Sequence, residues 1–223
     1  MTAPAPAAGT TTSERDWWLR TLAVFQAPHA VFAALRDDSE EAANARSEPV
    51  LALVLLAGIS GILYTGASGR FLDEPLVDDS LAVLAVLVFF AGSIYGTAAY
   101  WVGGAFVHLG LRGAGGQGSY RRARHILAFA AAPLVLNLLL VWPVRLIAYG
   151  GDWFRSGGSD AGAGHWVFEG VSALFGLWSL GLLVYGISVV ERWTLLRALV
   201  SLALVLLALL ILTLVIVIPL SAG

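Results

Sequence analysis

Five apolar stretches, each long enough to cross a lipid bilayer, limit what this chain can fold into. They cover about residues 49–66, 81–109, 126–149, 166–190 and 198–220. A helix needs about 20 predominantly apolar residues to span the hydrocarbon core, because each residue adds about 1.5 Å to its length. Charged residues make up only 13% of the chain, about half the share in an ordinary soluble domain. The sequence therefore predicts an all-α, polytopic membrane protein with a bundle of five transmembrane helices.

The arginines alternate between the two sides of these stretches and so predict an orientation. Of the 13 basic residues, only Arg70, Arg145 and Arg155 fall on the side that faces away from the N-terminus. Loops rich in basic residues stay in the cytoplasm during insertion, which predicts a cytoplasmic N-terminus and an external C-terminus. Every basic residue is arginine, and Ala, Leu, Val and Gly are abundant. We interpret this as a GC-rich bacterial genome and expect a multi-pass protein of the inner (plasma) membrane.

The segment before the first stretch divides into a tail and a helical region. Residues 1–12 are nearly all Ala, Pro and Thr, too poor in large apolar groups to form a core, and predict a disordered tail. Residues 13–48 predict cytoplasmic juxtamembrane helices, with a broad apolar face formed by Trp17, Trp18, Leu22 and Phe25. An amphipathic helix of this kind is typical of membrane surfaces. We therefore expect Trp17 and Trp18 to contact lipid or a partner.

Four arginines lie in the connection between the second and third stretches: Arg112, Arg121, Arg122 and Arg124. Near a membrane surface each would attract anionic headgroups by about 1 kcal/mol. Orientation alone would also require arginines at this place. The connection is thus a candidate contact for anionic lipid or for a partner.

The second and third stretches are irregular in different ways. Residues 81–109 are too many for a straight crossing of about 30 Å, which predicts a tilt, an extension or a bend. They also carry a stripe of small residues: Gly92, Gly96, Ala99 and Gly103. The third stretch contains Pro133 and Asn137. Lipid offers no hydrogen-bond partner for the side-chain amide of Asn137. Two interpretations stay open: Asn137 forms an interhelical hydrogen bond, or it lies on a polar pathway where Pro133 loosens the helix.

Two further residues with charge lie near the predicted outer ends of the third and fourth stretches. Arg145 and Glu169 have side chains long enough to reach the interface. A salt bridge between them is one interpretation, and separate snorkelling of each is the one we favour. Trp142, Trp153 and Trp166 gather near the same boundary. They predict an aromatic belt.

The sequence contains no pattern typical of catalysis or of cofactor binding. It has no cysteine, no H-E-x-x-H pair and no G-x-S-x-G elbow. Gly113, Gly115 and Gly118 match the spacing of a dinucleotide-binding loop, but a membrane helix precedes them where a buried strand is required. We predict a non-enzymatic protein without cofactor, metal or nucleic acid.

Three groups of residues occur in a set order along the chain. The first is Phe25-x-x-Pro28-x-x-x-Phe32-x-x-Leu35. The second runs from His108-Leu109-Gly110-Leu111-Arg112 through Ser119 and Arg124 to Ala128-Phe129-Ala130-Ala131-Ala132-Pro133. The third is Trp178-Ser179-Leu180 with Leu182, Leu183 and Gly186, followed by Arg197-Ala198. Over roughly residues 25–218 this order resembles the Yip-domain family (Ypt-interacting proteins) in its bacterial branch.

The resemblance implies a five-helix membrane domain with a cytoplasmic N-terminus and no catalytic residues. Eukaryotic members of the family are associated with Rab-type GTPases, membrane traffic and membrane shaping. This chain lacks their D-L-Y-G-P-like segment; Asp73-Glu74-Pro75-Leu76 is the nearest comparison and follows the first span. Those eukaryotic roles are therefore not carried over.

The leading hypothesis is a protein of the Yip-like type that organises the membrane or partner proteins at its cytoplasmic face. The expected partners are membrane lipids, anionic ones among them, and a membrane or cytoplasmic protein; a homo-oligomer is left open. The alternative is a small transporter or channel whose pathway follows the second and third spans.

Overall fold

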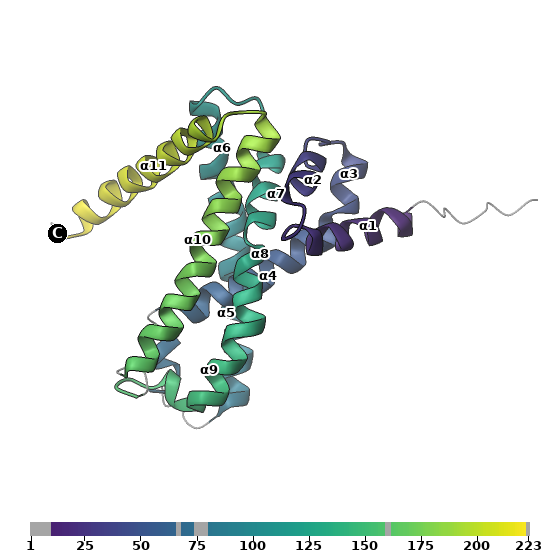
Figure 1. Ribbon diagram of the computed structural model, residues 1–223. Coiled ribbons are helices and arrows are strands. Elements are labelled where there is room, and N and C mark those ends of the chain that lie inside the picture. Colours follow the sequence, from purple (N-terminus) through teal and green to yellow (C-terminus); the bar gives the residue numbers. More distant parts are fainter. Residues whose placement is uncertain (1–9, 66–67, 74–79, 159–161, 222–223) are drawn as a thin grey trace, which may run out of the picture.

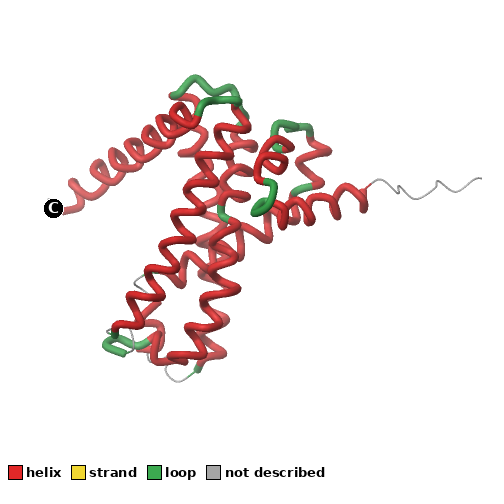
Figure 2. Tube along the Cα trace, viewed as in Figure 1, coloured by secondary structure: helices red, strands yellow, loops and turns green. Residues whose placement is uncertain are grey.

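The computed structural model describes residues 10–65, 68–73, 80–158 and 162–221, which are helical throughout with short connections. The elements follow one another along the chain as α1 (Thr10–Ala23), α2 (Pro28–Ala34), α3 (Glu40–Ala45), α4 (Ser47–Tyr64), η1 (Ser68–Asp73), α5 (Leu81–Ala98), η2 (Ala99–Gly103), α6 (Gly104–Gly113), α7 (Tyr120–Ala130), α8 (Ala132–Leu136), η3 (Asn137–Val141), α9 (Trp142–Tyr149), η4 (Gly150–Phe154), α10 (Ala163–Glu191) and α11 (Leu195–Ser221). Figure 2 shows helix along nearly the whole trace.

Within the described residues, 5 helical segments are long and apolar enough to cross a membrane. They are Ser47–Tyr64, Leu81–Gly113, Tyr120–Phe154, Ala163–Glu191 and Leu195–Leu212. In Figure 1, α10 runs beside the series α7 to α9, with α4 and α5 behind them, and α11 turns away from the body. The prediction of an all-α bundle with five spans is confirmed.

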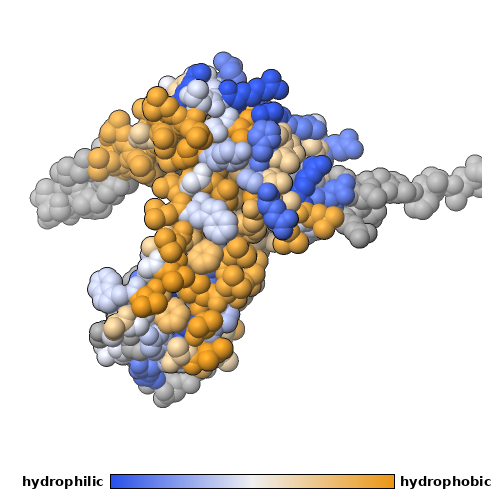
Figure 3. Space-filling view, viewed as in Figure 1, coloured by the Kyte–Doolittle hydropathy of each residue, from blue (hydrophilic) through white to orange (hydrophobic). Residues whose placement is uncertain are grey.

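We call the end of the bundle that carries α2, α3 and the α6–α7 connection the basic end, and the end that carries η1, α9 and η4 the opposite end (Figure 1). Hydrophilic residues gather at the basic end in Figure 3, whereas hydrophobic residues cover much of the bundle and the described part of α11. An apolar surface of this extent suits a lipid environment.

A single turn of π-helix interrupts each of the two long spans. In the second span η2 separates α5 from α6, and in the third η3 separates α8 from α9. Pro133 and Pro143 stand in the first turns of α8 and α9. Proline has no N–H to bond the preceding turn, so the third span is divided where its prolines lie. Single π turns of this kind often accompany functional sites.

Close packing of α4 against α5 uses the glycine stripe that the sequence shows. A side chain on Gly58 would overlap the carbonyl oxygen of Gly92 and come within 2.5 Å of the Cα atom of Gly96. Gly61 instead faces the ring of Tyr95. The backbone of α4 therefore occupies the space that side chains would take at Gly92 and Gly96, as in small-residue contacts between membrane helices.

Three short helices precede the first span and pack against the bundle. Helix α1 begins at Thr10, so the last residues of the predicted tail are helical, while residues 1–9 lie outside the described part. Helix α1 lies across the direction of α10 (Figure 1). Pro28 opens α2, and the Ser39 hydroxyl caps α3 by accepting a hydrogen bond from the backbone N–H of Ala42.

Candidate functional site

A cluster of charged groups around the buried Arg46 joins the N-terminal helices to α7. The Arg46 side chain has an exposed fraction of 0%. Its Nε donates to Nδ1 of His125 at 2.8 Å, its Nη1 donates to the backbone oxygen of Asp37 at 2.7 Å, and its Nη2 lies 3.5 Å from Oδ1 of Asp38. From the start of α7, Arg121 Nε approaches the same Asp38 oxygen at 3.0 Å, and the Ser119 hydroxyl donates to the other. We call these residues the Asp38 cluster.

The Asp38 carboxylate is held in its charged form by this cluster. Partial burial acts to raise the pKa of Asp38, but hydrogen bonds from Ser119 and Arg121 and the charges of Arg121 and Arg122 outweigh it and leave the pKa below the ordinary 3.8. Ionised Asp38 therefore compensates the buried charge of Arg46 at neutral pH. The cluster fastens a juxtamembrane segment to a helix about 80 residues later in the chain.

Three of the four arginines predicted to contact lipid bind the protein itself. Arg121 belongs to the Asp38 cluster, and Arg122 donates to the backbone oxygen of Arg36 at 2.9 Å. The Arg124 guanidinium lies over the ring of Trp101, 3.7 Å from its centroid. Of the four, Arg112 is the exposed one, and the other three are partly buried. A run of basic residues does not reveal which of its members fold back onto the protein.

The two tryptophans of α1 point in different directions, which corrects the prediction of a shared apolar face. Trp17 is 4% exposed and packs against Phe129 at a centroid distance of 5.7 Å, whereas Trp18 is 43% exposed. Adjacent helical residues lie about 100° apart around the axis, so they seldom share a face. Leu19 and Leu22 are exposed as well. Trp18, Leu19 and Leu22 form what we call the outer face of α1.

The polar site predicted within the third span lies inside the bundle. Asn137, 2% exposed, begins η3, and its Nδ2 donates to the Ser60 hydroxyl of α4 at 3.4 Å. Its Oδ1 is buried without a partner among the described residues. Pro133 is buried one turn earlier, in α8. Asn137 thus makes a weak interhelical hydrogen bond and still has a free acceptor.

A family model described as the Yip1 domain matches residues 22–217. The chain belongs to the Yip1 family. No curated protein and no solved structure matches it. The resemblance recognised from the ordered motifs is thereby confirmed over most of the chain.

The motif residues of this Yip1 domain contact one another, although they are far apart in sequence. Phe25 packs edge-on against Trp178 of α10 at a centroid distance of 5.3 Å. Phe32 is fully buried against Gly186, where a Cβ atom would come within 2.5 Å of the ring. The absence of a side chain at Gly186 is what admits Phe32. The N-terminal motif and the fourth-span motif therefore form one docking contact.

At the opposite end of the Yip1 domain, Arg145 corrects the expectation of snorkelling. Its side chain is 1% exposed and forms an ion pair with Glu169 at 3.0 Å. The guanidinium also lies over the rings of Trp142 and Trp153, 4.7 and 4.1 Å from their centroids. These two tryptophans are buried, and only Trp166 is exposed in the manner of an aromatic belt. Cation–π contacts and the ion pair together compensate the buried charge.

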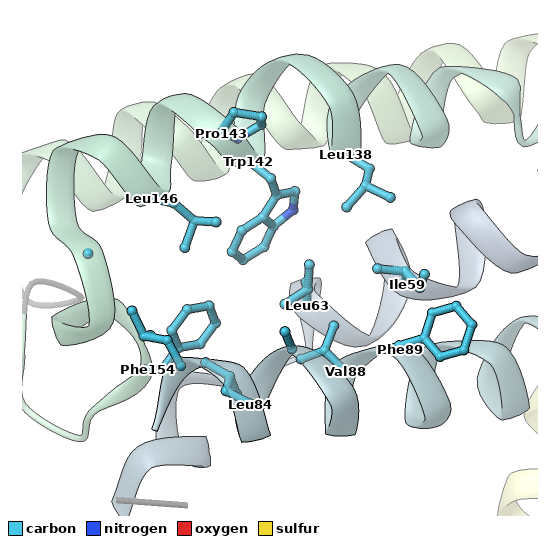
Figure 4. Close-up of a pocket in the computed structure, with 13 residues that line it drawn as sticks. Ile59, Leu63, Leu84, Val88, Phe89, Leu138, Trp142, Pro143, Leu146 and Phe154 are labelled. Carbon is cyan, nitrogen blue, oxygen red and sulfur yellow. The ribbon is translucent and has the colours of Figure 1, made fainter. Parts of the chain in front are cut away.

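An apolar cavity of ≈ 410 Å³ adjoins this aromatic group. Leu84, Val88 and Phe89 enter it from α5, and Trp142 projects into it from the side of α9 (Figure 4). The Trp142 ring nitrogen has no hydrogen-bond partner among the described residues. The lining otherwise offers only apolar contacts, which suit a hydrocarbon chain.

The functional candidates that the sequence did not single out are Asp38, Arg46 and Ser172. Ser172 lies in α10, is 4% exposed, and its hydroxyl has no hydrogen-bond partner among the described residues. In the sequence, Asp38 and Arg46 resemble other charged residues of the juxtamembrane segment. Ser172 is one polar residue in an apolar stretch. No group of three or more His, Asp or Glu side chains in the described residues is placed to hold a metal ion. What the site offers is a fastened N-terminal segment and buried polar groups.

Proposed function

We propose that this Yip1-family membrane protein is non-enzymatic and organises membrane lipids or a partner protein at its basic end, which faces the cytoplasm. The observation that carries the proposal is the outer face of α1. The Asp38 cluster and the Phe32–Gly186 contact hold the N-terminal helices in place, yet Trp18, Leu19 and Leu22 stay exposed. Exposed apolar side chains on a fastened helix suit a membrane surface or a partner.

The absence of cysteine makes this surface directly testable. Leu22→Cys and Asn44→Cys each place one thiol on the N-terminal helices, at an exposed apolar and an exposed polar position. After attachment of a fluorophore and reconstitution in phosphatidylcholine vesicles, nitroxide-labelled lipid should quench the probe at position 22 and spare the probe at position 44. Equal quenching at both positions would contradict a lipid-facing role for α1.

We propose that Arg112 attracts anionic headgroups, because it is the exposed one of the four arginines between the second and third spans. In vesicles of mixed anionic and neutral lipid, Arg112→Ala should reduce the preference of the protein for bound anionic lipid by about fivefold, the effect of one headgroup contact of about 1 kcal/mol. Gln117→Ala, an exposed neutral position in the same connection, should leave the preference unchanged. A reporter fused to the C-terminus tests the orientation; activity in the cytoplasm would overturn it.

A small transporter or channel is the second candidate, because Asn137 keeps a free acceptor inside the bundle. Asn137→Leu in proteoliposomes should then abolish flux of a small polar solute while the protein still folds. Gly92 packs against Ile59 of α4 and so does not line such a pathway, which favours the organising role.

A further inference from the structure

A second cavity, of ≈ 700 Å³, lies around Asn137 between α4, α5, η3 and α10. Three buried polar residues line it, Ser60, Asn137 and Ser172, all at most 4% exposed. Tyr64, Thr65 and Tyr95 also carry hydroxyl groups in the lining. Leu177 and Leu180 also line it and are well exposed on the outside of α10. The cavity therefore reaches the lateral surface of the bundle, within the membrane-spanning part of the chain.

Two buried polar atoms at this cavity have no hydrogen-bond partner among the described residues. They are Oδ1 of Asn137, which can only accept, and Oγ of Ser172, which can donate and accept. A buried polar group without a partner is costly. An occupant that donates to Asn137 and accepts from Ser172 would remove both costs, and an alcohol hydroxyl can do both.

The rest of the lining determines what else the occupant contains. No Asp, Glu, Arg or His is among the lining residues, and most of the lining surface is apolar. A phosphate or ammonium group would be buried there without a compensating charge. An apolar chain, by contrast, matches the leucines, and the size lies within the range of small-molecule pockets, about 300–1,000 Å³.

We propose that this cavity binds a neutral lipid with a free hydroxyl group, of the monoacyl- or diacylglycerol class. The hydroxyl lies between Asn137 and Ser172, and an acyl chain leaves past Leu177 and Leu180 into the bilayer. Gly176 supplies the room, because a Cβ atom built there meets nothing within 4 Å. The inference does not depend on the organising role of the basic end.

Photo-crosslinking tests the proposal in the full chain, reconstituted in phosphatidylcholine nanodiscs. The probe is a diacylglycerol with a diazirine in one acyl chain, and the competitors are unlabelled diacylglycerol and its 3-O-methyl ether, which lacks the hydroxyl donor. We expect saturable labelling of α10 and α4, with diacylglycerol competing about tenfold better than the ether, the usual effect of one hydrogen bond. Equal competition by the two lipids would overturn the selection of a hydroxyl.

Gly176→Leu fills the cavity without touching its polar groups, and labelling should fall about tenfold or more. Gly181→Leu is the matched control: it lies on the same helix, also faces open space and does not line the cavity. Asn137→Leu removes the acceptor to which the lipid hydroxyl donates and should erase most of the preference for diacylglycerol over its ether. Wild-type labelling in Gly176→Leu, or no saturable labelling in the wild type, would show that the cavity holds only water or bulk lipid and would overturn the proposal.

Discussion

Buried polar groups have partners in the Asp38 cluster, whereas two of them lack a described partner in the cavity around Asn137. In the cluster, the fully buried Arg46 is matched by His125, Asp37 and Asp38 from other segments. In the cavity, the neutral Oδ1 of Asn137 and Oγ of Ser172 have no partner within the part of the chain that the structure describes. Matched polar groups fasten helices together, whereas unmatched ones keep their hydrogen-bonding capacity for something that is not part of the chain. The difference separates a structural region from a candidate binding region.

Removal of the buried cation should have the largest effect. Arg46→Leu leaves Asp38 and His125 without their shared partner, and breaking a buried pair costs about 3–5 kcal/mol. Thermal unfolding in mild detergent should show the loss. Arg112→Leu, at an exposed position, should change the unfolding free energy by less than about 0.5 kcal/mol. If Arg46→Leu unfolds like the wild type, the cluster does not fasten the N-terminal helices.

Gly186 tests the apolar half of the same docking contact. In Gly186→Ala the new Cβ atom would come within 2.5 Å of the Phe32 ring, and such overpacking costs about 1–3 kcal/mol. Unfolding measurements on Gly186→Ala and on Gly186→Ala with Phe32→Leu should show partial rescue in the double variant. Gly181→Ala, which meets open space, serves as the control. Additive losses in the double variant would mean that Phe32 and Gly186 are not coupled.

Acid should weaken the cluster through Asp38. Because the pKa of Asp38 is lowered below 3.8 in the folded protein, its contribution is complete above that value and is lost as the pH falls through the lower, folded-state pKa. Asp38→Asn should reduce stability at pH 7 by about 1.5 kcal/mol, the usual effect of a hydrogen bond to a charged group.

The difference between Asp38→Asn and wild type should shrink as the pH falls below 4, as measured by unfolding at a series of pH values. A difference that persists unchanged in acid would assign the effect to another group.

The smallest effect is expected in the cavity, where Ser172→Ala removes a hydroxyl that has no partner. Its loss should leave the unfolding free energy unchanged or raise it by up to about 1 kcal/mol, because an unsatisfied group is no longer buried. Ser60→Ala, which removes the acceptor for Asn137, is the comparison and should be destabilising. A clear loss in Ser172→Ala would place this hydroxyl among the structural groups and remove the contrast with the Asp38 cluster.

Much of the fold could be predicted from the sequence, but little of the candidate site. Apolar stretches of sufficient length predict spans directly, since the bilayer sets both length and polarity. The interruption near Asn137 was also visible in the prolines. The pairing of Arg46 with His125 could not be foreseen, because 79 residues separate the two along the chain and only folding brings them together. Nor could the sequence separate Trp17 from Trp18, since both suit an apolar surface.

The sequence by itself determined that this protein is a five-span helical membrane protein of the Yip1 family, because hydrophobic length and motif order are properties of the chain. The tertiary structure alone decided which polar groups have partners. Three of the four arginines in the basic connection fold back onto the protein, and Arg145 pairs with Glu169. Oδ1 of Asn137 and Oγ of Ser172 are left without a partner among the described residues. Hydrogen bonds and ion pairs act over a few ångströms, so only the packing of distant segments settles which are made.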